Sequence, residues 1–172
     1  MTDNDHAYSK GDWMVHLYYG IGQVKGIERK HISGKMAKYY RVETKDIVFW
    51  VPVEETNPCR VRPLTPPSKL RKALKALEKP PCEMDPDYRQ RLIRVKDARS
   101  DGSLLSICRL IRDLSARQAE DSIGQNEKRA LDFFEKLLLA EWSVNADVTV
   151  EDAGRQLRDL LEKGRTQVCA MD

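Results

Sequence analysis

The sequence predicts an α+β protein, in which a small, strongly bent antiparallel β-barrel precedes a compact all-α bundle of about five helices. Two observations predict this class. Before residue 65, apolar residues alternate with polar ones or form short runs, as they do in β-strands. After Pro66 they recur every three or four positions, as they do in amphipathic helices. We therefore divide the chain into a β domain (residues 1–65), a helical domain (66–165) and a tail (166–172).

The first two strands are predicted from an alternating segment and its interruptions. Residues 13–17 alternate between two sets of side chains, which indicates a half-buried strand. Gly20 and Gly22 are expected to break the chain after it. Strict alternation then fails between Val24 and Ile27, and Gly26 lies where a β-bulge would restore one inward face.

The remaining strands follow from turn residues and apolar runs. Residues 33–35, Ser-Gly-Lys, are typical of a hairpin turn. Tyr40 and Val42 then face one side of the next strand. An apolar run at 47–51 ends at a proline, and residues 59–62 predict a short last strand. Four or five short strands in so short a segment favour a small barrel.

The helices are predicted to start at Pro66, Asp85, Ser103, Gln125 and Thr149. The third carries the broadest apolar stripe, so we expect it to lie at the centre of the bundle. For the second, the expected buried side is formed by Tyr88, Leu92 and Val95. The last begins with capping-box spacing from Thr149 to Asp152, and its expected inward residues include Val150.

Charge and cysteine content narrow the class of protein. The net charge is +3, but residues 66–99 carry 10 basic and 5 acidic residues, whereas residues 100–172 carry 10 and 14. A basic middle segment indicates a polyanionic partner, or simply a solvated helix face. The four cysteines form no Cys-x-x-Cys pair, and neither a signal peptide nor a membrane-spanning run is visible. We expect a cytoplasmic protein without disulfides.

The residues needed for catalysis are missing from the sequence, so we expect no enzymatic activity, no metal and no cofactor. There is no phosphate-binding loop and no nucleophile elbow. His16 and His31 could meet across strands, but two histidines without a third ligand make a poor metal site. A binding module is the remaining class. A barrel can join a partner sheet through an exposed strand edge, and a basic helical segment can hold a phosphate backbone.

Seven segments of the chain form a pattern through their order and spacing. They are 11–15 (GDWMV), 19–24 (YGIGQV), 26–28 (GIE), 39–42 (YYRV), 51–54 (VPVE), 109–114 (RLIRDL) and 127–131 (EKRAL). In this pattern the sequence resembles the CarD/CdnL family of bacterial RNA-polymerase-binding transcription regulators. The β half also resembles the RNA-polymerase-interacting domain of the transcription–repair coupling factor.

The resemblance implies a Tudor-like barrel that docks on the polymerase β subunit through its sheet edge, and a helical domain that contacts promoter DNA. That contact would lie near the −10 element and stabilise the open complex. Members of the family have no enzymatic activity and no cofactor. The expected partners are therefore RNA polymerase and, weakly on its own, DNA. We expect a monomer without membrane contact, associated with the nucleoid through polymerase.

The resemblance assigns the polymerase-binding residues to two strands. They are Arg29 and Lys30, with His31 beside them, and Trp50, Val51 and Pro52. The family often has an arginine where this chain has Trp50. An exposed Trp50 would be a good interface anchor. The alternative is that it belongs to the barrel core, as the surrounding apolar run suggests.

The DNA-binding residues that the resemblance implies are Met84, Tyr88, Arg89, Arg91 and Lys96. Met84 stands where the family places a tryptophan wedge, and methionine can also insert between base steps. Asp85 and Asp87 are repulsive toward phosphates, and Arg91 could instead pair with Asp87 on the helix surface. Two alternatives stay open: a protein–protein adaptor on polymerase with no DNA contact, and a structural subunit that oligomerises through its helices.

Overall fold

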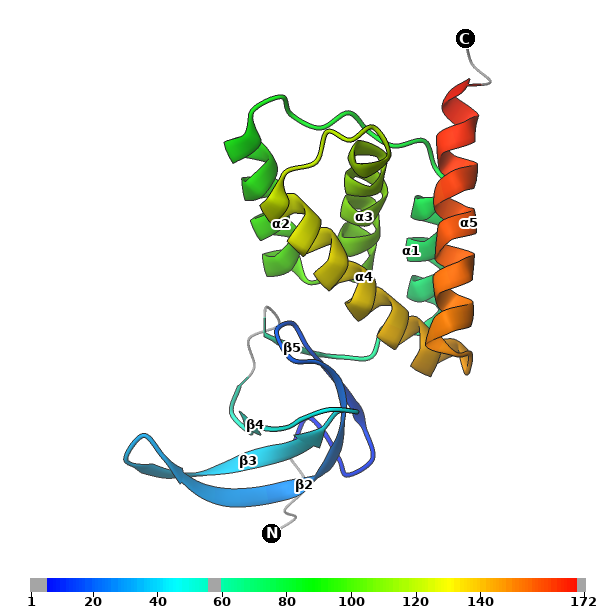
Figure 1. The fold of residues 1–172 in the computed structure, drawn as a ribbon. Coiled ribbons are helices and arrows are strands. Elements are labelled where there is room, and N and C mark those ends of the chain that lie inside the picture. The colour runs from blue at the N-terminus through cyan, green and yellow to red at the C-terminus, as the bar shows by residue number, and fades with distance from the viewer. Residues whose placement is uncertain (1–5, 56–59, 170–172) are drawn as a thin grey trace. The chain divides into compact units, whose positions relative to one another are not determined.

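A computed structural model describes residues 6–55 and 60–169 and confirms the α+β class. Figure 1 shows a sheet of strands β1–β5 followed by helices α1–α5. The chain divides into two compact units, Met1–Leu64 and Thr65–Asp172. The first contains all the described strands, and the second contains all the described helices.

The five described strands form one open antiparallel sheet in the order β4-β3-β2-β1-β5. The strands expected to form a small barrel therefore form an open sheet. Closure would need a ladder between β4 and β5, but among the described strands β4 pairs with β3 alone and β5 with β1 alone. Of the last predicted strand, Cys59 lies outside the described residues. The strands are β1 (Trp13–His16), β2 (Gly20–Ile32), β3 (Lys35–Glu43), β4 (Val48–Pro52) and β5 (Val61–Pro63).

Glycines shape the long β2–β3 hairpin. The predicted bulge is confirmed: the register shifts between Val24 and Gly26, and Gly26 has a φ of 154°. The predicted turn is confirmed as a two-residue loop in which Ser33 and Gly34 both have positive φ, the type that matches strand twist. The expected break at Gly20–Gly22 is wrong, because these residues pair with β1 and begin β2.

One face of the sheet forms its core. The buried residues on it come from all five strands: Met14, Val24, Tyr40, Val42, Phe49, Val51 and Val61. β1 is more buried than the predicted half-buried strand. Its Met14 and Val15 are both 0% exposed, while Trp13 is 36% exposed. Alternation within one strand thus underestimated how completely β1 is covered.

The helical unit contains five helices within its described residues, as predicted. They are α1 (Pro67–Leu77), α2 (Tyr88–Asp101), α3 (Leu104–Ala119), α4 (Gln125–Ala146) and α5 (Val150–Cys169). Caps set several ends. The Asp87 carboxylate accepts from Arg89 N at 2.9 Å, and Thr149 Oγ1 accepts from Asp152 N at 3.0 Å. Helix α5 includes residues 166–169, which the sequence assigned to a tail.

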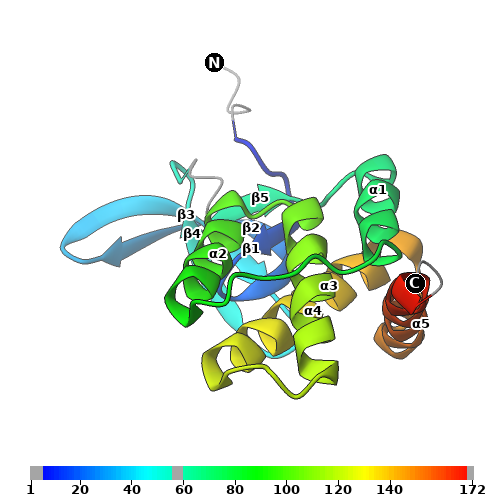
Figure 2. The same ribbon diagram turned by 90° about the horizontal axis from the view of Figure 1, so that it is seen from above.

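Helix α3 is the centre of this unit, as its broad apolar stripe predicted. It contacts each of the other four helices, and α1 and α2 lie on opposite sides of it (Figure 2). Its apolar residues Ile107, Cys108 and Ile111 are completely buried. None of the helices in the described ranges is long and apolar enough to cross a membrane.

Two of the predicted inward faces are wrong in part. In α2, Leu92 and Val95 are half-buried, and in α5 Ala153, Leu157 and Leu161 are buried as predicted. In α2 the buried residues are Arg91 and Ala98, whereas Tyr88 is 38% exposed. The cause is an ion pair, described below, that carries the Arg91 side chain inward. In α5, Val150 is 51% exposed because it lies in the first turn of the helix, beyond the buried stripe that begins at Ala153.

Candidate functional site

Four side chains on the face of the sheet opposite the core form a polar cluster around Trp50. Trp50 Nε1 donates to Glu28 Oε2 at 2.9 Å, and Lys30 Nζ lies 3.3 Å from the centroid of the Trp50 ring. Arg41, the cross-strand partner of Trp50, lies 3.8 Å from Glu28. We call Glu28, Lys30, Arg41 and Trp50 the Trp50 cluster. All four are half-buried, so Trp50 is a surface residue and not part of the core.

The other residues assigned to polymerase binding lie in different environments. Val51 is 3% exposed and belongs to the core, while Pro52 is exposed beside it. Arg29 pairs across the hairpin with Lys38, on the opposite face of the ribbon from Lys30. The structure thus brings Lys30 and Trp50 together, leaves Pro52 beside them on β4, and separates Arg29 from the cluster.

Strand β4 lies at the edge of the sheet, and no described strand pairs with its outer side. Val53 N donates to Lys38 O at 3.0 Å, and Thr44 N donates to Ile47 O at 2.9 Å. Hydrogen-bonded and non-bonded residue pairs alternate along an antiparallel ladder. These two bonds therefore determine which residues of β4 are hydrogen-bonded to β3 and which are not. Val48 and Trp50 therefore direct their backbone polar groups away from β3, toward the open edge. The Pro52 carbonyl also points away from β3 but accepts from Glu55 N at 2.9 Å. Pro52 has no N–H, so the row of outward donors ends there.

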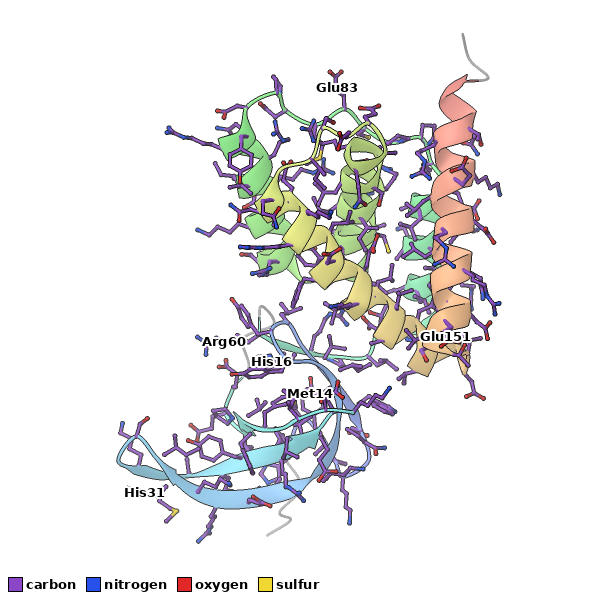
Figure 3. The ribbon with its side chains drawn as sticks, viewed as in Figure 1. Met14, His16, His31, Arg60, Glu83 and Glu151 are labelled. Carbon is purple, nitrogen blue, oxygen red and sulfur yellow. The ribbon has the colours of Figure 1, made fainter. Side chains whose placement is uncertain are left out.

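An aromatic pocket lies at the end of β1. The His16 ring stacks on Tyr19 at 4.5 Å and meets Phe49 at 5.3 Å, while Arg60, Trp50 and Pro52 also line the pocket. Figure 3 shows His16 beside Arg60, and His31 far away near the end of the β2–β3 hairpin. His16 Nδ1 accepts from the backbone N–H groups of Tyr18 and Tyr19, both at 3.1 Å. Burial, with a smaller effect of Arg60, lowers the pKa of His16.

The start of α2 displays two of the residues assigned to DNA binding. The Tyr88 hydroxyl accepts from Asn126 Nδ2 at 2.8 Å, which places the first turns of α2 and α4 side by side. Arg89 is exposed, and Lys96 lies seven residues later on the same face of the helix. Ile93, between them on this face, is 48% exposed. We call Tyr88, Arg89 and Lys96 the α2 face.

Met84 and Arg91 do not belong to this surface, which corrects the sequence-based assignment. Met84 is 6% exposed, so the structure does not present it as a wedge. Arg91 is 8% exposed, and its Nε donates to Glu127 Oε1 at 2.7 Å. Its Nη1 also donates to the carbonyl oxygens of Asp85 and Pro86, at 2.9 and 2.8 Å. Arg91 thus fixes the segment before α2 onto α4 and does not pair with Asp87.

Sequence reasoning missed two cations near the α2 face. Lys128 and Arg129 are exposed near the start of α4, and Arg129 is three residues from Asn126 and so shares its side of the helix. The sequence contained a signal for this, because Gly124 and Glu127 have capping-box spacing and place both cations within the first two helical turns. Within the described ranges, no group of three or more His, Cys, Asp or Glu side chains could hold a metal ion.

Comparison with protein-family models covers most of the chain. Residues 8–65 match the model described as CarD-like/TRCF RID domain, and residues 72–158 match the model described as CarD, C-terminal domain. The two matches occur in the expected order, one on the sheet unit and one on the helical unit. The chain therefore belongs to the CarD-like family of RNA-polymerase-interacting transcription regulators.

Proposed function

We propose that this protein binds the β subunit of bacterial RNA polymerase through the open edge of β4. We further propose that its α2 face contacts promoter DNA near the −10 element and stabilises the open complex. The proposal rests above all on the outward backbone groups of Val48 and Trp50, because such an edge can accept one strand of a partner sheet. No catalytic step and no cofactor are needed.

The Trp50 cluster would give the docked strand its specificity. Trp50 and Lys30 are already held by Glu28 before a partner arrives. Preorganised side chains lose little entropy on binding, and tryptophan is a frequent anchor of protein interfaces. Pro52, which offers no donor, would mark where pairing with the partner strand stops.

The α2 face would add a weak, sequence-independent contact with DNA. A few phosphate contacts give dissociation constants of only ~10⁻⁴–10⁻⁶ M at physiological salt. Docking on polymerase raises the local concentration of DNA to the millimolar range for a short connection, so contacts of this strength become significant. The exposed carboxylates Asp85 and Asp87 near Arg89 favour the alternative, an adaptor on polymerase that does not touch DNA.

The edge of β4 is tested by replacing Val48 with proline. Val48→Pro removes an outward N–H and leaves the ladder with β3 intact, because Val48 is not hydrogen-bonded to β3. We expect capture of the chain by purified bacterial RNA polymerase to weaken about tenfold or more, the equivalent of ~1.4 kcal/mol. Val48→Ala is the matched control and should bind normally. Equal binding by both variants, with both folded, would refute docking through this edge.

The DNA contact is tested by Arg89→Ala, with Arg155→Ala on α5 as the control for loss of an exposed arginine. Loss of a charge-assisted hydrogen bond of ~1.5 kcal/mol would shorten the lifetime of the open complex about tenfold. Polymerase capture without DNA should stay unchanged. A normal open-complex lifetime for Arg89→Ala, together with normal capture, would identify the protein as an adaptor without DNA contact.

A further inference from the structure

The β2–β3 hairpin extends past the strand that covers its base. β4 pairs with β3 from Tyr39 to Glu43, and the last bond between them joins Val53 N to Lys38 O. Residues 29–38 continue as a two-stranded ribbon that projects from the sheet (Figure 1). We call this ribbon the hairpin arm. Apart from the bond between Val53 N and Lys38 O, its described residues pair in the sheet with one another, and most of them are exposed.

The charge of the hairpin arm is of one sign. It contains Arg29, Lys30, Lys35 and Lys38 and no Asp or Glu. Arg29 and Lys38 are direct cross-strand partners. Like charges in this position are destabilising, and among the described residues no carboxylate lies within ion-pair distance of either. An anion bound between these cations would remove the repulsion.

The two faces of the arm have different neighbours. Lys30 faces the Trp50 cluster, whereas Arg29, Lys38 and Met36 lie on the opposite face, on the side of Tyr40. Lys35, next to the turn, is on the Lys30 face by register but also lines the groove of the opposite face. That second face lines a groove together with Pro52, Val53 and the carboxylate-bearing Glu54. A partner docked on the Trp50 cluster would therefore leave Arg29 and Lys38 accessible.

We propose that the hairpin arm is a second nucleic-acid contact, in which Arg29, Lys35 and Lys38 hold the phosphate backbone of duplex DNA. A two-stranded β-ribbon fits the major groove, and three cations to which the described residues offer no ion-pair partner match a polyanion. Met36, 65% exposed at the end of the arm, offers an apolar contact to the bases. This contact is separate from the α2 face and does not require it.

The test compares two variants of the full chain that lose the same charge. Lys35→Gln/Lys38→Gln removes two cations from the arm, and Lys10→Gln/Lys45→Gln removes two exposed cations of the same unit outside it. Binding of a short fluorescent DNA duplex is measured by anisotropy between about 50 and 200 mM salt. The arm variant should bind about tenfold more weakly at the lower salt, with the log–log salt slope reduced by about two. The control should match the unmodified chain.

Two further measurements separate this proposal from the proposed function. Polymerase should capture the arm variant normally in the absence of DNA. If polymerase failed to capture this variant, the arm would belong to the polymerase interface and the proposed DNA contact would be overturned. In an Arg89→Ala background the arm variant should weaken duplex binding by the same factor. Equal duplex binding by the arm variant and its control would show that the cations of the arm face solvent without contacting DNA, and would overturn the proposal. A loss of affinity for polyglutamate but not for duplex DNA would indicate an acidic protein partner instead, and would also overturn the proposal.

Discussion

At the scale of single residues, the two glycines of α5 have opposite roles. A Cβ on Gly164 would lie 2.6 Å from Lys79 O and 2.9 Å from Leu77 O, both backbone atoms at the end of α1. At Gly154 it would meet its neighbours only at 3.8 Å or more. Gly164→Ala should lower the free energy of unfolding by about 1–3 kcal/mol. Gly154→Ala should raise it by ~0.5–1 kcal/mol. Urea denaturation measures both, and equal effects would contradict the close approach of α5 to α1.

His16 makes the stability of the protein depend on pH. Burial lowers its pKa in the folded chain, where neutral Nδ1 accepts two backbone N–H groups. Below about pH 6.5 the unfolded chain binds a proton at His16 that the folded chain does not, so stability falls as the pH decreases through this range. It continues to fall until the lowered pKa is reached. The His16→Asn variant should lack this pH-dependent part of the stability. The measurement is the unfolding free energy of both proteins at several pH values between 7 and 5, and the difference between them should change with pH. An identical pH profile would contradict it.

Arg91 and Arg89, two residues apart on α2, should respond differently to the same substitution. Arg91→Met leaves the buried Glu127 carboxylate with Arg117, at 3.6 Å, as its one ion-pair partner among the described residues, and should cost about 3 kcal/mol of unfolding free energy. Arg89→Met changes an exposed residue and should shift stability by less than about 0.5 kcal/mol. Normal stability of Arg91→Met together with weaker DNA binding would restore Arg91 to the DNA-binding residues.

At the scale of elements, local patterns predicted most helices and turns, because their causes are local. Gly26 predicted the bulge, Ser33-Gly34 the turn, and the apolar stripe of α3 its central position. Closure of the sheet was not predictable in this way. It depends on whether β4 and β5 share a ladder, which neither segment encodes by itself.

The same limit applied to the candidate site. That Trp50 and Lys30 share one face follows from the register of three strands, which no single segment encodes. Met84 and Arg91 were assigned to DNA by position in the sequence. Both are buried, and the burial of Arg91 depends on Glu127, a residue of another helix, whose carboxylate attracts Arg91 inward. Arg89 and Lys96 stay predictions, now supported by their exposure on one face of α2.

At the scale of the whole molecule, the two compact units should respond separately to damage in their cores. Val42→Ala removes a fully buried side chain of the sheet, and Leu114→Ala one of the helical unit. Each should cost about 2–4 kcal/mol, and their effects should add, because the two sites share no partner. Differential scanning calorimetry should show each substitution lowering the transition of its own unit. A single transition lowered equally by both would show that the units unfold together.

The open sheet has a consequence for how copies of the protein behave at high concentration. A sheet that does not close offers two unpaired edges, and repeated edge-to-edge joining is the route by which such folds grow into fibres. Here both edge strands are short, and each ends at a proline, Pro52 in β4 and Pro63 in β5. Neither edge can therefore template a long ladder. The same prolines that limit a partner strand to a few bonds also keep the unoccupied protein from polymerising with itself.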